Sequence, residues 1–276
     1  MQIIKPSVEY WEHGNDREAH IARCAAVCYM SKKYDKDALI KHLINHNHLS
    51  MFRHATRYYI VGYTSYAGQL LRNYLDCCRT FGVNPLLHVY KGIQAMYVST
   101  NEQYIMEHTG FKTLMSPHEV SFEQFVQSSE SKELIRLTFC VITSIKVSRE
   151  LNRVSPNNIA EQSTRYVNLF VKNKDIPVCE SVEDGLSAVD KAIIAESLSN
   201  STKTYSDLIE SGIRPEDARR VLPLDTATKC VYTYTVKEWK HIINLRYFGT
   251  TGKPAPDAKV IGEMLYNAIK ELGYYD

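Results

Sequence analysis

The stretch KVSRELNRVSPNNIAEQSTRYVN, residues 146–168, decides how the middle of the chain folds, because it is rich in charge and follows an apolar run at 137–141. Ser144 has the side chain of a helix N-cap, and good helix formers come after it. Pro156 and the asparagines at 157–158 end that helix soon after it has begun. The sequence therefore predicts a strand, a short helix, a turn and a second polar segment.

The second polar segment carries Glu161, Ser163 and Arg165 at every other position. In an extended backbone these side chains lie on one face, so that a carboxylate, a hydroxyl and a guanidinium converge. Arginine can fork onto a phosphate, and a hydroxyl adds a further donor. The pattern favours a phosphorylated small ligand, although the spacing alone also fits a surface ladder of ion pairs.

The composition is that of an ordinary globular chain and gives no sign of a nucleic-acid or membrane partner. The 276 residues are 44% hydrophobic and 23% charged, enough for one large domain or two modest ones. A formal charge of +2 gives no overall field for nucleic acid or membrane, so we expect neither as a partner. No run approaches the roughly 18 apolar residues of a membrane span, and the polar start is unlike a signal peptide.

The cysteines and histidines point to neither a disulfide framework nor a metal. The seven cysteines form no CxxC pair and no zinc-ligand spacing, and their odd number argues against a disulfide framework. Reduced thiols are expected, which favours a cytoplasmic protein. His42 and His46 have the i, i+4 spacing of some metal ligands, but no carboxylate stands between them as in a zincin motif, and we expect no metal site.

Hydrophobic periodicity and turn residues predict the other elements. Strands are expected at 2–10, 55–61 and 92–100, and from 226 until a helix begins near Thr235. Helices are expected at 16–29, 35–46, 65–79, 102–108, 189–211, after Pro215 and at 256–272. The segments 117–133 and 173–183 are expected to be an exposed connection and a loop.

The sequence ELNRVSPNNIAEQSTRY, residues 150–166, resembles the signature of the flavin-dependent thymidylate synthases. In that signature an Arg-His-Arg triplet is followed, after seven residues, by Ser-x-Arg. Arg153 matches the first arginine, and Ser163 and Arg165 match the last part. Val154 and Ser155 stand where the family has histidine and its second arginine.

A second stretch carries the same resemblance. The family pattern Ala-Arg-x-Val-Leu-Pro is matched at 218–223, its later threonine by Thr228, and its Leu-Arg by 245–246. Before the strand at 55–61 the family has a histidine that contacts the flavin, and His54 falls on that position.

The resemblance implies an α/β (α+β) fold with a central, mainly antiparallel sheet flanked by helices. It implies a single domain, 1–276, in which 64–136 is an insertion, and a homotetramer with sites built from several subunits. The reaction that it implies is methylation of dUMP to dTMP, with methylenetetrahydrofolate as the carbon donor and with FAD and NADPH.

The residue roles implied by the resemblance fall into two groups. Those that hold dUMP are Glu150, Glu161, Ser163, Arg165, Arg219 and Arg246, of which Arg246 is also the catalytic cation beside a uracil carbonyl. Those that hold FAD are His54, Arg153, Lys237 and His241.

The flavin half of the pattern departs most from the family. Besides the changes at 154 and 155, Thr235 and Lys237 replace the asparagine and arginine of Asn-x-Arg, and Val260 lies in a weakened carboxy-terminal motif. Three hypotheses stay open: a flavin-dependent thymidylate synthase or related pyrimidine C5-alkylating enzyme, a homologue that binds a pyrimidine nucleotide without FAD and catalyses another C5 modification or none, and an unrelated protein with structural arginines.

Overall fold

The central sheet is built on two long antiparallel strands, β7 (Arg136–Ser144) and β10 (Ala227–Thr235), which pair along their whole length. The computed structural model describes residues 2–31, 33–81, 84–169 and 176–275. Strand β2 (Ser7–Trp11) pairs with β7, and β8 (Ile159–Glu161) pairs with β10, also antiparallel. The strand order is β2-β7-β10-β8.

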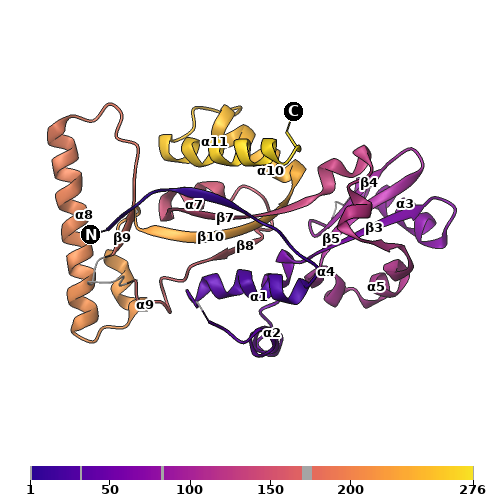
Figure 1. Cartoon of the computed structure of the whole chain (residues 1–276), viewed down its shortest axis with the longest axis horizontal. Coiled ribbons are helices and arrows are strands. Elements are labelled where there is room, and N and C mark those ends of the chain that lie inside the picture. The colour runs from indigo at the N-terminus through magenta and orange to yellow at the C-terminus, as the bar shows by residue number, and fades with distance from the viewer. Residues whose placement is uncertain (1, 32, 82–83, 170–175, 276) are drawn as a thin grey trace.

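Helices cover both faces of this sheet, with α10 (Val236–Ile243) and α11 (Pro256–Glu271) above it and α1 (Arg17–Cys28) and α2 (Lys36–Asn45) below it in Figure 1. The strands serve both faces because their side chains alternate. Phe139 and Tyr232 pack in the cluster that contains Trp239 of α10. Their neighbours Cys140 and Val231 pack in the cluster that contains Cys24 and Val27 of α1. The expected central antiparallel sheet flanked by helices is confirmed.

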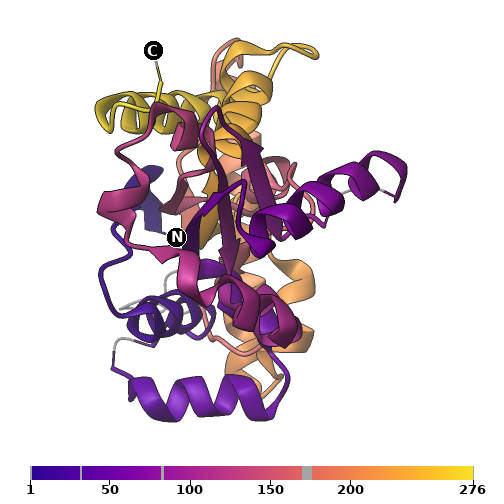
Figure 2. The same cartoon turned by 90° about the vertical axis from the view of Figure 1, so that its right-hand side faces the viewer.

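A second antiparallel sheet lies at one end of the molecule, in the order β4-β5-β3-β6 (Figures 1 and 2). Its strands are β3 (Thr56–Gly62), β4 (Leu87–Lys91), β5 (Ala95–Asn101) and β6 (Glu119–Val120). The helices around it are α3 (Tyr66–Phe81), α4 (Glu102–Glu107), α5 (Thr109–Met115) and α6 (Phe122–Phe125). That 64–136 is an insertion in a single domain stays a prediction.

The expectation of an exposed connection at 117–133 is wrong. This segment contains β6 and α6, and Phe125 is fully buried with its ring centroid 4.4 Å from that of Tyr58. Ser131 is also buried and donates a hydrogen bond to the carbonyl of Phe125. The segment is mostly polar in composition, so the sequence did not indicate that Phe125 anchors it to the core.

At the other end of the molecule, β1 (Gln2–Ile4) pairs in parallel with β9 (Pro177–Cys179), near α8 (Ala188–Glu210) and α9 (Pro215–Ala218) (Figure 1). The single strand expected at 2–10 is therefore two strands in two sheets, which separate at Lys5 and Pro6. The loop expected at 173–183 begins outside the described residues, and its described part contains β9.

The expected helices form where their caps predict. Asp16, Asp35 and Thr235 are N-caps whose side chains accept the backbone N–H three residues on. Ser144 caps α7 (Ile145–Leu151) in the same way, by accepting from the backbone of Val147. None of the helices in the described ranges is both long and apolar enough to span a membrane.

Candidate functional site

Two adjoining hollows lie between α7, the turn after β8 and the segment that follows α9. They have volumes of about 370 and 470 Å³, and both are lined by Ile145, Arg149, Thr164 and Arg219. The first is also lined by Ser148, Glu161, Gln162 and Ser163, and the second by Glu216, Arg220, Leu222, Pro223 and Leu224. We call the two together the arginine hollow.

Local structure places each polar group of the arginine hollow. The chain turns after β8, where the hydroxyl of Ser163 accepts the backbone N–H groups of Arg165 and Tyr166 at 3.1 and 3.2 Å. The extended conformation expected for 161–165 is therefore wrong beyond Glu161. A 3₁₀ turn, Arg219–Val221, follows α9 and presents Arg219 to the hollow.

Glu161 is held in one orientation by two hydroxyl donors. Ser148 Oγ, from α7, and Thr228 Oγ1, from β10, donate to Glu161 Oε1 at 2.9 and 3.1 Å. A carboxylate fixed in this way can accept a hydrogen bond from a ligand hydroxyl or ring N–H, but it repels a phosphate. It therefore marks the end of the hollow that a phosphate does not occupy.

The cations Arg149 and Arg219 make the hollow electropositive. Arg219 Nη1 makes only a long hydrogen bond of 3.5 Å, to the hydroxyl of Thr164. Within the described ranges neither arginine has a carboxylate partner in an ion pair, whereas Arg220 pairs with Asp217. Both arginines are exposed, so their guanidinium groups are available to an anionic ligand. Arg149 belongs to the charged stretch 146–168, but no sequence pattern assigned it a role.

Arg165 lies at the edge of the arginine hollow and does not line it. Its Nε donates to Glu216 Oε2 at 3.0 Å, and its guanidinium carbon lies 4.9 Å from the centre of the Tyr166 ring. Glu216 itself lines the hollow. Of the three residues expected to converge, Glu161 and Ser163 line one hollow with Arg219, and Arg165 is turned to Glu216.

Arg246 and Glu150 form a separate pair on another side of α7. Arg246 Nε donates to the backbone carbonyl of Glu150 at 2.8 Å, and Arg246 Nη1 lies 3.6 Å from Glu150 Oε2. The Arg246 side chain is only 13% exposed, and this burial lowers its pKa. Neither residue lines the arginine hollow.

The family model described as "Thymidylate synthase complementing protein" matches residues 97–266, which contain most of this site. The chain belongs to this family. The resemblance drawn from residues 150–166 and 218–246 is thus confirmed at the level of the family.

Two relatives of the thymidylate synthase complementing family show how far the match extends. The flavin-dependent thymidylate synthase of Thermosipho africanus is 30% identical over 159 residues, which are 52% of this chain and 60% of the relative. That of Pyrococcus furiosus is 28% identical over 145 residues, 46% of this chain and 58% of the relative. The match therefore spans little more than half the length of these relatives.

Among solved structures, the UMP/dUMP methylase PolB from Streptomyces cacaoi bound with 5-Br dUMP aligns over 99% of this chain and 93% of that chain. The sequence identity is 16% and the TM-score is 0.46.

Within the described part of the chain, the residues that the family resemblance assigns to FAD lie outside the arginine hollow. His54 is fully buried, with Nδ1 2.8 Å from Thr233 Oγ1, and burial together with nearby positive groups lowers its pKa to about 3. Arg153, Lys237 and His241 are exposed and line neither part of the arginine hollow.

The substituted positions of the flavin pattern already have structural uses. Thr235 is buried and caps α10, donating to Glu238 Oε2 at 2.8 Å and accepting from the Glu238 backbone at 3.2 Å. Val154 packs against the main hydrophobic core, and Val260 lines a small hollow beside Cys179. The donors of a single chain therefore do not fit FAD in the way that the family pattern holds it.

Proposed function

We propose that this member of the thymidylate synthase complementing family binds a pyrimidine nucleoside monophosphate, dUMP, and methylates its C5 atom. The observation that carries the proposal is the arginine hollow, in which Arg149 and Arg219 have no carboxylate partner within the described part of the chain. Two unneutralised guanidinium groups beside a hydroxyl suit a phosphate monoester.

The two ends of the hollow suit the two ends of the nucleotide. Arg149 and Arg219 bind the phosphate, and the hydroxyl of Ser163 adds a donor. Glu161, fixed by Ser148 and Thr228, accepts a hydrogen bond from the sugar or the ring. The fixed carboxylate sets the direction in which the nucleotide enters.

Arg246 is proposed as the cation that stabilises negative charge on the uracil ring while C5 is activated. Its contacts with Glu150 hold the guanidinium at a defined place, although that place is outside the arginine hollow. A site that uses both therefore needs Arg246 from a second copy of the chain, in line with the homotetramer that the resemblance implies.

Methylenetetrahydrofolate is the proposed carbon donor. The resemblance implies FAD and NADPH as the reductants of this reaction. Because Thr235 and Val154 serve a helix cap and the core, a second candidate function is kept: binding of the nucleotide without FAD, with another C5 modification or no reaction.

The deciding experiment is the visible absorption spectrum of the purified protein, followed by calorimetric titration with dUMP and with FAD, each in the presence and absence of the other. A flavin spectrum or saturable FAD binding supports the flavin-dependent reaction and justifies assays with methylenetetrahydrofolate. Colourless protein that binds dUMP but not FAD favours the second candidate. Failure to bind dUMP contradicts both.

A further inference from the structure

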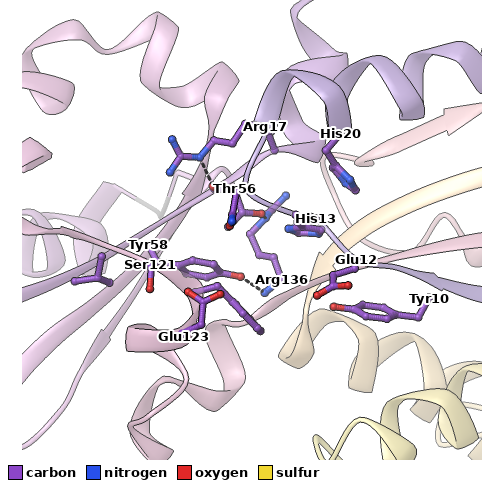
Figure 3. A pocket seen from close by; sticks show the side chains of 15 residues that line it. Tyr10, Glu12, His13, Arg17, His20, Thr56, Tyr58, Ser121, Glu123 and Arg136 are labelled. Carbon is purple, nitrogen blue, oxygen red and sulfur yellow. Dashed lines mark hydrogen bonds between the residues drawn. The ribbon is translucent and has the colours of Figure 1, made fainter. Parts of the chain in front are cut away.

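A second cavity, of about 410 Å³, lies where the first turn of α1 meets the second sheet and the start of β7. Figure 3 shows Arg136 in its middle, between Thr56 and His13, with Glu123 and Tyr10 on either side. The cavity shares no lining residue with the arginine hollow. Its size is in the range of small-molecule sites.

Arg136 is a buried cation whose pKa is lowered by burial, and the negative charge of Glu238 offsets this only in part. Its side chain is among the largest that are fully buried, at 2% exposure. Nε donates to the hydroxyl of Thr56 at 3.2 Å and Nη2 to the carbonyl of Arg53 at 2.7 Å, but Nη1 has no hydrogen-bond partner. No carboxylate within the described ranges forms an ion pair with it. A buried, unpaired charge is strongly unfavourable unless an anion meets it.

The histidines beside Arg136 add no further positive charge. His13 and His20 lie 2.7 and 3.2 Å from the hydroxyl of Thr138, which lies 2.7 Å from that of Thr233. Burial and neighbouring positive groups lower the pKa of His13 well below its ordinary value and that of His20 to about 4. Both rings are therefore neutral near pH 7, and the single positive charge of Arg136 remains.

The other lining residues restrict the kind of anion. Glu12 and Glu123 are exposed at the cavity and repel a phosphate dianion about twice as strongly as a monoanion. Arg17, which also lines the cavity, is paired with Glu119, so Arg136 is the cation that can balance a single negative charge. Tyr10, Tyr58 and Phe122 give the walls aromatic surface, which suits a planar ring.

We propose that this cavity binds a small aromatic monocarboxylate, with its carboxylate on the guanidinium of Arg136 and its ring between the tyrosine and phenylalanine side chains. The hydroxyl of Tyr58, which also lines the cavity, accepts the backbone N–H of Arg136 at 3.0 Å, so its own proton is available to a ligand there. The site is independent of the nucleotide site and of the proposed reaction.

The test uses benzoate as the probe and benzamide as its neutral counterpart, titrated into the full chain by calorimetry. Benzoate is expected to bind at least about tenfold more tightly than benzamide, because one charge-assisted hydrogen bond is lost in the amide. Arg136→Met is expected to weaken benzoate binding by a similar factor. Val120→Trp keeps Arg136 but fills the cavity, which Val120 lines, and is expected to abolish binding even if the first variant does not fold.

Two controls separate this site from the nucleotide site. Inorganic phosphate tests the charge of the ligand, and dUMP titrated into Val120→Trp tests independence, because its affinity is expected to match that of the parent. The proposal is overturned if the parent does not prefer benzoate to benzamide, if either variant binds benzoate as tightly as the parent, if phosphate binds at Arg136 more tightly than benzoate, or if Val120→Trp loses dUMP.

Discussion

Arg165 Nε donates to Glu216 Oε2 at 3.0 Å, so an ion pair closes the edge of a hollow in which Arg149 and Arg219 have no carboxylate partner among the residues that the structure describes. Arg165 is 54% exposed and Glu216 25% exposed, so water screens the pair and its contribution to stability is small. A nucleotide phosphate can therefore compete for Arg165 by displacing Glu216.

The first prediction concerns this pair. Glu216→Gln removes the competing carboxylate and is expected to tighten dUMP binding by up to about fivefold, the equivalent of about 1 kcal/mol. Arg165→Ala is expected to weaken binding, and calorimetry measures both. Unchanged dUMP affinity in both variants would show that Arg165 stays outside the nucleotide site.

The second prediction concerns Arg219. Arg219→Ala is expected to weaken dUMP binding by about tenfold or more, since it removes a charge-assisted contact of about 1.5–3 kcal/mol. Thermal stability should hardly change, because Arg219 is exposed and makes only the long bond to Thr164. Arg72→Ala is the matched control: Arg72 is also exposed but belongs to α3, beside the second sheet. If both variants lost the same dUMP affinity, the effect would come from the change in net charge and not from a contact made by Arg219.

Local signals in the sequence predicted most of the helices and the two long strands. Ser144 could be identified as a cap because a capping side chain bonds only to its own next turn. The strand at 137–141 and its partner from 226 were equally clear, because buried central strands are continuously apolar or β-branched.

Features that depend on distant parts of the chain could not be predicted. The division of 2–10 into β1 and β2 depends on pairing with β9 and β7, which are far along the chain. The burial of Phe125 depends on Tyr58. At the site, the turn at Ser163 redirected Arg165 although its spacing from Glu161 fitted an extended strand.

The third prediction concerns pH. In the folded chain burial lowers the pKa of His20 to about 4 and that of His54 to about 3. Burial also lowers the pKa of His13 well below the ordinary value of 6.5. As pH falls below 6.5 the unfolded chain takes up protons that the folded chain does not, so stability is full above 6.5 and is lost on acidification towards about 4.

Each of these histidines can contribute up to about 1.4 kcal/mol per pH unit to that loss. Denaturant unfolding measured between pH 7 and 5 gives the slope of the unfolding free energy against pH. His20→Asn is expected to reduce the number of protons taken up on unfolding by about one. A slope equal to that of the parent would mean that His20 is protonated in the folded chain.

The last prediction concerns the substituted flavin positions. Thr235→Ala removes the cap of α10 and is expected to lower stability by about 1 kcal/mol, whereas Thr235→Asn keeps a capping side chain and should be nearly neutral. If the substitutions weaken the flavin site, adding histidine and arginine through Val154→His and Ser155→Arg to Thr235→Asn should tighten FAD binding, measured by flavin fluorescence. The Thr235→Ala variant with the same two changes is the control. Equal FAD affinity in the triple variant and the parent would place the determinants of flavin binding elsewhere in the chain.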